Sequence, residues 1–378
     1  MVASVANALG HPLEDLALSR STIRRSRMAT RKQVTEADKD SFSVECPLLL
    51  HWYGKLLPDI AGAEETVDRI AVIVTGTNGI EKLLAVPKIG RGTGSEQAAA
   101  CLTVLDEWKI CNVVQGLVFD TTSSNTGIHK GACVFIEEAL GLELVNIGCR
   151  HHVLEVILSN VFTALFGGIR GPEVGLFKRF KKKWPYIQQT DYSPAKDELF
   201  SSVTEILRKE MVTFYTNAIT HQQPREDYLE LIRLCLVFLG AGSAVTDITF
   251  RAPGAMNNAR WMAKAIYSLK MVLFKGQLTL TARELKGLTE LALFVALVYG
   301  RFWHEAPLAS HAPLNDVQML GLLQTYPNRT VADAAFSALS RHLWFFSEHI
   351  VGLAFFDDRV ESHVKKAMAV FGRQPSAS

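Results

Sequence analysis

The sequence predicts an α/β fold in which a mixed β-sheet is followed by a large all-helical region. Up to about residue 166, short runs of β-branched and aliphatic residues alternate with turns and with segments of helical period. From residue 153 onward almost every segment has the helical period, and prolines fall between the segments. The chain has 378 residues, of which 48% are hydrophobic, so it is long enough for two parts and can bury a substantial core.

The N-terminal segment, residues 1–45, is polar and basic. It predicts a helix from Pro12 to Arg31, because Glu14 and Asp15 at its start are favourable near a helix N-terminus.

Five strands are predicted next. The first three are separated by short Gly-containing turns, which indicates an antiparallel meander. The fourth is apolar throughout, as in strands that are buried on both faces. The five runs are Leu48–Trp52, Arg69–Thr75, Lys82–Lys88, Val113–Phe119 and Leu142–Ile147.

Helices are predicted between and after the last strands. Ser95–Lys109 has its apolar residues on one face, and Ser95 is the expected N-cap. Lys130–Leu140 is the second helix, and a long helix follows Gly148 and runs to about Phe166.

This order of three antiparallel strands, helix, strand, helix and strand is the order of a ribonuclease-H-like domain, predicted here over residues 46–166. In such a sheet the first and fourth strands are neighbours, so Tyr53 and Asp120 at their ends should lie together. Residues 167–378 should form an all-helical insertion and C-terminal helices. The helical segments expected there are Leu199–Tyr215, Asp227–Leu239, Arg260–Leu273, Ala282–Tyr299 and Val331–Phe346.

Asp120 is the most informative single residue, because it ends an apolar strand and precedes a polar turn that closes at Gly127. Nucleases present metal-binding carboxylates in this way. A two-metal site needs two or three carboxylates around cations ~3.5–4 Å apart. The matching position on the first strand holds Tyr53, whose phenol, with a pKa of ~10, is not a ligand for hard cations at neutral pH. The sequence therefore predicts that the carboxylate site around Asp120 is incomplete and binds no cofactor. Mg²⁺ or Mn²⁺ would be its cofactor only if the protein were an active enzyme.

A basic run at residues 178–184 interleaves cations with Phe180 and Trp184; the cations are Lys178, Arg179, Lys181, Lys182 and Lys183. Cations beside aromatic rings can bind phosphates and stack bases. A solvated helix face with two aromatic anchors in the core accounts for the run equally well. The same two interpretations apply to the N-terminal cluster, which consists of Arg20, Arg24, Arg25, Arg27, Arg31 and Lys32.

Three other patterns carry weaker hypotheses. Cys149 and His152 have the spacing of half a zinc site, but no second pair lies nearby, which favours a structural role at a strand-to-helix junction. Trp261 opens a helix and is expected in the core. Asp357 and Asp358 are adjacent, so a helix cap or a surface position is expected of them rather than a metal site.

Composition sets the expected location. The net charge of +2 points to no particular partner, and six cysteines without paired spacing indicate a reducing environment. The first 20 residues lack the pattern of a signal peptide, and Leu291–Tyr299 is far shorter than the ~20 apolar residues that cross a bilayer. We expect a nuclear or cytoplasmic protein without a membrane partner.

Taken together, three segments resemble transposases of the hAT superfamily. They are Phe119–Gly127, Cys149–Glu155 and Ala259–Met262. The segment His51–Lys55 is similar to the HWDGK segment of uncharacterised, transposase-derived invertebrate proteins. The resemblance extends over about residues 20–370, and it implies a ribonuclease-H-like core that is interrupted by a helical insertion.

The resemblance also implies roles for single residues. In the family, two aspartates and a glutamate bind the metal ions, and the second aspartate corresponds to Asp120, while the first corresponds to Tyr53. In the family the glutamate lies in a C-terminal helix beyond the position of Ser378, and Glu348, which is expected in a helix of the last third of the chain, is a poorly matching candidate within the sequence. The family's Cys-x-x-His motif corresponds to Cys149 and His152. Its Arg-Trp pair, in which Trp assists at a flipped base, corresponds to Arg260 and Trp261.

The expected function is that of a transposable-element-derived protein without catalytic activity that retains weak nucleic-acid binding. An active metal-dependent DNA transposase or nuclease is one alternative. A helical scaffold for protein interaction is the other.

Overall fold

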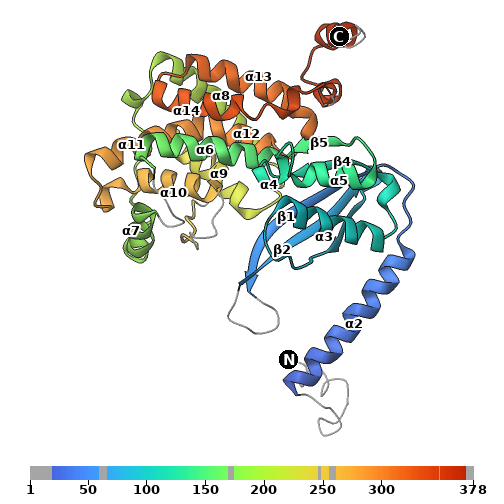
Figure 1. Ribbon diagram of the computed structural model, residues 1–378. Coiled ribbons are helices and arrows are strands. Elements are labelled where there is room, and N and C mark those ends of the chain that lie inside the picture. The colour runs from blue at the N-terminus through green and yellow to red at the C-terminus, as the bar shows by residue number, and fades with distance from the viewer. Residues whose placement is uncertain are drawn as a thin grey trace. The chain divides into compact units, whose positions relative to one another are not determined.

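The computed structural model describes residues 19–58, 66–168, 174–245, 248–254, 261–348 and 350–371. The chain divides into two compact units, Met1–Asn146 and Ile147–Ser378 (Figure 1). Each unit has its own hydrophobic core.

A five-stranded mixed sheet forms the centre of the first unit, and its order is β3-β2-β1-β4-β5. The strands β1 and β2 and the strands β2 and β3 are antiparallel, whereas β1 and β4 are parallel. The strands are β1 (Leu48–Pro58), β2 (Thr66–Gly76), β3 (Glu81–Ala85), β4 (Val114–Phe119) and β5 (Val145–Gly148). The predicted mixed α/β architecture with five strands is confirmed.

One face of the sheet is packed against helices α3 (Gly94–Glu107) and α5 (Ala132–Leu140) (Figure 1). Alternate residues of each strand point into this core because successive side chains of a strand lie on opposite faces. The fully buried strand residues on this face include Leu48, Leu50, Trp52, Ile70, Val72, Val74, Leu117 and Phe119.

Two boundaries in the sheet differ from the prediction. The strand β1 does not end at Trp52, because it stays paired with β2 as far as Pro58 and Thr66, so Tyr53 lies inside the strand rather than at its end. The N-cap of α3 is Thr93 rather than Ser95. The backbone of Thr93 is extended, and its hydroxyl accepts a hydrogen bond from the amide of Glu96 at 3.4 Å.

A long basic helix, α2 (Arg20–Ser41), precedes the sheet. The sequence predicted its end at Arg31, but the helix continues for ten more residues, and residues 12–18 of the predicted helix lie outside the described part of the chain. Its C-terminal end is attached to the unit by Phe42, which packs edge-on against Trp108 with ring centroids 5.5 Å apart. An ion pair of 2.9 Å between Lys82 and Asp38 supports this attachment.

The first turn of α2 contains no acidic residue, and its first half is rich in arginine. Cations near a helix N-terminus oppose the helix dipole, which costs roughly 0.3–1 kcal/mol for each charge in the first turn. Arginines three or four residues apart also repel each other, by about 0.2–0.5 kcal/mol per pair. Arg20 in the first turn and the neighbouring arginines along the helix therefore add an electrostatic cost to its formation.

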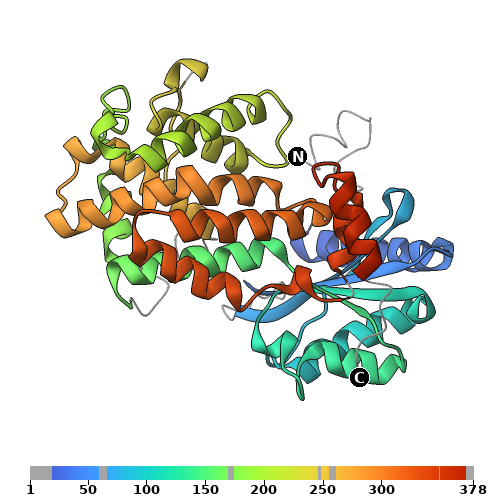
Figure 2. The ribbon, with the colours of Figure 1, turned by 90° about the horizontal axis from the view of Figure 1, so that it is seen from above.

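After β5 the described residues of the second unit form helices and short 3₁₀ turns joined by loops, with no further strand among them (Figure 2). Its long central helix α6 packs against α10, α11 and α14. The α-helices are α6 (Arg150–Phe166), α7 (Gly175–Lys183), α8 (Ser202–Ala218), α9 (Glu226–Phe238), α10 (Trp261–Leu273), α11 (Ala282–Phe294), α12 (Gly300–Glu305), α13 (Ala312–Thr325), α14 (Arg329–Ser340) and α15 (Ser362–Phe371). The predicted helix Val331–Phe346 is too long, because α14 ends at Ser340 and a separate 3₁₀ turn, Trp344–Phe346, follows it.

The expectation of a helix cap or a surface position for Asp357 and Asp358 is met in part: Asp358 is exposed and Asp357 is the C-cap residue of the 3₁₀ helix Val351–Phe356, but Asp357 does not lie at the surface. Its side chain is inaccessible to solvent, and both carboxylate oxygens accept hydrogen bonds from Arg359. Arg359 also donates to Glu305 at 3.0 Å, and the Arg359 guanidinium lowers the pKa of Asp357. No local pattern indicated this arrangement, because the partner Glu305 is far away along the chain.

No helix in the described ranges is both long enough and apolar enough to cross a membrane.

Gly94 places the start of α3 against the loop that follows α4 (Ser123–Thr126). A Cβ atom at this position would lie 2.3 Å from the carbonyl oxygen of Lys130 and 2.6 Å from that of Ser124. Both are backbone atoms, so the two segments would have to move apart to admit a side chain.

We therefore expect Gly94→Ala to destabilise the protein by about 1–3 kcal/mol, the usual cost of overpacking. Urea unfolding should show a lower midpoint with an unchanged slope. Gly54→Ala is the matched control, because a Cβ atom there meets nothing within 4 Å. Equal midpoints for the two variants would contradict the close approach.

Candidate functional site

Tyr53 lies in β1, and Asp120 directly follows β4, the strand that pairs with β1. The last residues that the parallel register pairs are His51 and Val118, and the same register continued by two residues on each chain sets Tyr53 opposite Asp120 on one face of the sheet. This face is opposite to the one that carries the buried Trp52 and Phe119. The strand order thus brings together the two positions that the sequence compared.

The carboxylate of Asp120 is held by the turn that follows it. Its Oδ1 atom accepts hydrogen bonds from the backbone N–H of Thr122 at 3.2 Å and from Nδ2 of Asn125 at 2.7 Å, and the hydroxyl of Thr122 donates to the same oxygen. An aspartate that accepts from the amide two residues later forms an Asx turn. Asp120 therefore organises the Thr121–Gly127 turn, which contains the short helix α4 that the sequence did not predict.

Asn125 connects this turn to β1. Its side chain is buried, and its Oδ1 atom accepts a hydrogen bond of 3.0 Å from the indole N–H of Trp52. A buried indole N–H needs such an acceptor, because an unsatisfied buried donor costs about 1–3 kcal/mol. Asn125 was not among the predicted site residues, although its place in the polar turn was the available signal.

His51 lies on the same face, two residues before Tyr53. Its Nε2 atom is 2.7 Å from the hydroxyl of Thr75, and its Nδ1 atom is 3.5 Å from the hydroxyl of Tyr53. Burial lowers the pKa of His51 to about 4, so the imidazole is neutral at neutral pH. The groups placed beside Asp120 on β1 are thus an imidazole and a phenol, and neither is a carboxylate.

Glu348, the candidate for the third metal-binding acid, does not lie in the element that was expected for it. It was expected in a helix, but it is exposed in a turn after the 3₁₀ turn Trp344–Phe346, in the second unit. Among the residues that the structure describes, no group of three or more His, Cys, Asp or Glu side chains is arranged to hold a metal ion.

The segment from Cys149 to His152 begins α6, directly after β5, and its side chains contact the helical unit. Arg150 is buried and pairs with the buried Asp316 of α13. His151 lies 2.7 Å from the hydroxyl of Tyr228, and its ring packs against Trp303, while His152 is 3.9 Å from Glu155. The partners on α9, α12 and α13 are distant in sequence, so only the structure could identify them.

The Arg-Trp pair, Arg260 and Trp261, lies at the edge of the described residues. Arg260 lies outside the described residues, and Trp261 is the first residue of α10, with a side chain that the structure does not describe.

Helix α7 separates its aromatic residues from its cations. Phe177 and Phe180 are buried, and Trp184 directly after the helix packs edge-on against Phe180 and Phe274, with ring centroids 5.5 and 5.9 Å apart. The aromatic residues are core anchors, as one of the two interpretations of the sequence required. The cations face outward and are all exposed: Lys178, Arg179, Lys181, Lys182 and Lys183.

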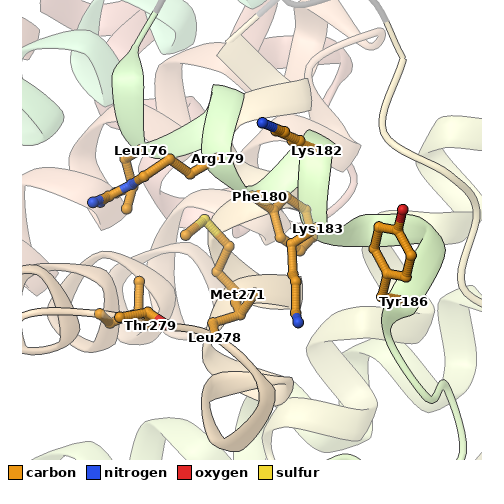
Figure 3. Close-up of a pocket in the computed structure, with 10 residues that line it drawn as sticks. Leu176, Arg179, Phe180, Lys182, Lys183, Tyr186, Met271, Leu278 and Thr279 are labelled. Atoms are coloured by element: carbon orange, nitrogen blue, oxygen red, sulfur yellow. The ribbon is translucent and has the colours of Figure 1, made fainter.

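A groove of about 550 Å³ lies beside this cationic face (Figure 3). Its lining is apolar at Leu176, Phe180, Met271, Leu278 and Leu280. Its remaining lining residues are largely polar or charged: Arg179, Lys182, Lys183, Tyr186 and Thr279.

Tyr186 is the residue of this groove that the sequence did not single out. Its side chain is 75% exposed, and the ammonium group of Lys183 lies 6.0 Å from the centre of its ring. Arg179 is paired with Glu284 of α11. The groove thus offers apolar surface, one accessible aromatic ring and positive charge at its edge.

No protein-family model matches this chain, and a comparison with curated proteins finds no match either. The function is therefore inferred from the geometry of the two sites and from the resemblance of the motifs.

The pKa of His51 gives a test of the geometry around Asp120. Because the folded-state pKa of about 4 is below the ordinary value of 6.5, the unfolded chain binds the proton more readily. Stability from the neutral imidazole is present above pH 6.5 and is lost as the pH falls from 6.5 towards 4.

We expect the unfolding free energy of the wild type to fall by up to about 3 kcal/mol more than that of His51→Gln between pH 7 and pH 4. Urea unfolding at a series of pH values measures this difference. His129→Gln, a change at an exposed histidine of the same unit, should keep the wild-type profile. Parallel profiles for the wild type and His51→Gln would show that His51 is not desolvated.

Proposed function

We propose that this protein derives from a transposase of the hAT type, binds nucleic acid through the outer face of α7 and does not cleave it. The observation that carries the proposal is the division of α7 into a buried aromatic side and an exposed cationic side. The exposed cations lie between residues 178 and 183, which is less than two turns of helix.

Such a face suits the phosphate backbone. Each cation that neutralises a phosphate releases condensed counterions, and this makes binding favourable without any contact to a base. The exposed ring of Tyr186, next to Lys183, adds a surface on which an unpaired base can stack. Binding of this kind has little sequence preference and depends strongly on salt.

The absence of cleavage is supported by the surroundings of Asp120. Its Oδ1 atom already accepts three hydrogen bonds from its own turn, and the strand position opposite carries Tyr53. Mg²⁺ is held through carboxylates and phosphate oxygens, and a single carboxylate does not place two cations for an in-line attack. An active metal-dependent transposase or nuclease is the alternative, and a cleavage assay distinguishes the two.

The groove beside α7 favours a second candidate function, a scaffold for protein interaction. Its apolar lining and basic edge fit an acidic peptide with one large apolar side chain. In that case the cations of α7 would serve the peptide, and nucleic acid would have no part.

Neutralising the three consecutive lysines tests the proposal. We expect Lys181→Gln, Lys182→Gln and Lys183→Gln together to weaken DNA binding with little regard to sequence. The salt slope of the affinity should fall by roughly one for each phosphate that the variant no longer neutralises. Fluorescence anisotropy with labelled oligonucleotides at several salt concentrations measures both quantities.

A matched control removes the same charge from other elements. Lys196, Lys209 and Lys366 are exposed lysines outside α7, and their joint replacement by Gln should change the slope much less. If the α7 variant keeps the wild-type affinity and slope, α7 is a plain solvated face, and the peptide interpretation of the groove gains support.

The catalytic part is tested by a cleavage assay. We expect no Mg²⁺- or Mn²⁺-dependent cleavage of DNA by the wild type. Tyr53→Asp should strengthen Mn²⁺ binding because it adds a second carboxylate opposite Asp120, but it should not give efficient strand transfer, since the described residues place no third acid in a group with these two. Nicking by the wild type that disappears in Asp120→Ala would mean that the site is complete.

A further inference from the structure

Helix α2 carries a row of arginines that no part of the proposed function uses. Arg24, Arg27 and Arg31 are three and four residues apart, and Arg20 precedes them by four, so all four positions fall within an arc of about 60° on the helix. We call Arg24, Arg27 and Arg31 the arginine stripe. Arg25 and Lys32 lie on a different side of the helix, because they are seven residues apart and about 100° away from the stripe.

The part of α2 that bears the stripe is open to a ligand. Every residue from 24 to 37 is exposed, and the helix contacts the rest of its unit at its C-terminal end, through Asp38, Lys39 and Phe42. Figure 1 shows α2 running outward from this attachment. Within the described residues, the stripe arginines have no acidic partner, whereas Lys32 is 3.8 Å from Glu36.

The arginines of the stripe are also placed at a cost to the helix. They are three and four residues apart, so their charges repel one another along one side of α2. A sequence that breaks such a local rule usually serves a function at that place. A polyanion bound along the stripe would remove this repulsion.

The dimensions indicate which polyanion. An α-helix with its side chains is about 10–12 Å wide, and the major groove of B-form DNA is about 12 Å wide. Stripe residues follow one another about every 4.5–6 Å along the helix axis, which allows successive arginines to reach successive phosphates or guanine edges. The major groove of A-form RNA is too deep and narrow to admit a helix.

We propose that α2 is a second nucleic-acid-binding element and that its arginine stripe binds double-stranded DNA in the major groove. This inference rests on the proposed function for the chemistry of the ligand alone. It concerns the first unit and does not use α7.

The test compares two pairs of substitutions in the full-length protein. The stripe pair is Arg24→Gln with Arg27→Gln, and the off-stripe pair is Arg25→Gln with Lys32→Gln. Both remove two charges from the same helix, and glutamine keeps a good helix propensity. The probe is a labelled DNA duplex, and circular dichroism verifies that each variant is folded.

We expect the stripe pair to lower the salt slope by about 1.8, which is 0.9 for each of two phosphate contacts. Between 50 and 200 mM salt, the wild type should then lose roughly tenfold more affinity than the stripe pair does. The off-stripe pair should change the slope by less than half as much. Arg24→Lys with Arg27→Lys should keep most of the wild-type slope, and an RNA duplex of the same sequence should bind more weakly than DNA.

Equal losses for the two pairs would overturn the proposal, because they would indicate a diffuse attraction rather than a stripe. An unchanged slope in the stripe pair would overturn it as well. The proposal would also be overturned if binding to phosphatidylserine vesicles depended on the arginine stripe and binding to the DNA duplex did not. The triple lysine variant of α7 separates this inference from the proposed function. If the stripe pair loses duplex binding and the α7 variant keeps it, DNA binding by α2 is supported and DNA binding by α7 is rejected.

Discussion

The parallel pairing of β1 with β4 determines where the candidate residues of the first unit lie. The register sends Trp52 and Phe119 into the core and places Tyr53 and Asp120 on the other face. Because side chains alternate along a strand, a slip by one residue would move both groups of side chains to the wrong face. The hydrogen bond from Trp52 to Asn125 adds a second connection between β1 and the turn after β4. The geometry around Asp120 thus follows from the packing of the sheet.

In the described residues, the helical unit shows how charges can be buried at a cost. Arg150 and Asp316 pair in the core, and burial of Asp316 raises its pKa while Arg150 opposes that rise. Asp357, Arg359 and Glu305 form a second charged group that joins the segment after α14 to α12. A buried pair such as Arg150–Asp316 offsets a large desolvation penalty only when both partners are present. It is therefore better understood as a constraint on geometry than as a source of net stability.

Patterns that repeat along the chain were the ones that could be predicted. The apolar runs of β1, β2 and β4 and the helical period of α3, α5 and α9 are local signals, and the structure has these elements at those places. The extension of β1 beyond Trp52 could not be predicted, because it depends on pairing with β2 rather than on its own residues. At the candidate site, the expected neighbourhood of the first and fourth strands is present, but Tyr53 lies inside β1 and not at its end. The partners of Arg150 and His151 were out of reach, because no local pattern connects residues more than 70 positions apart.

The Arg150–Asp316 pair also has a consequence for how this chain can change over time. Loss of one partner leaves a buried charge alone and costs about 3–5 kcal/mol, whereas joint replacement by apolar residues of similar volume is often neutral. Substitution at position 150 is thus tied to substitution at position 316, whatever the chain binds. The pair resists single-step change for reasons of packing alone. The start of α6, directly after Cys149, is therefore constrained by the helical core independently of any chemical role.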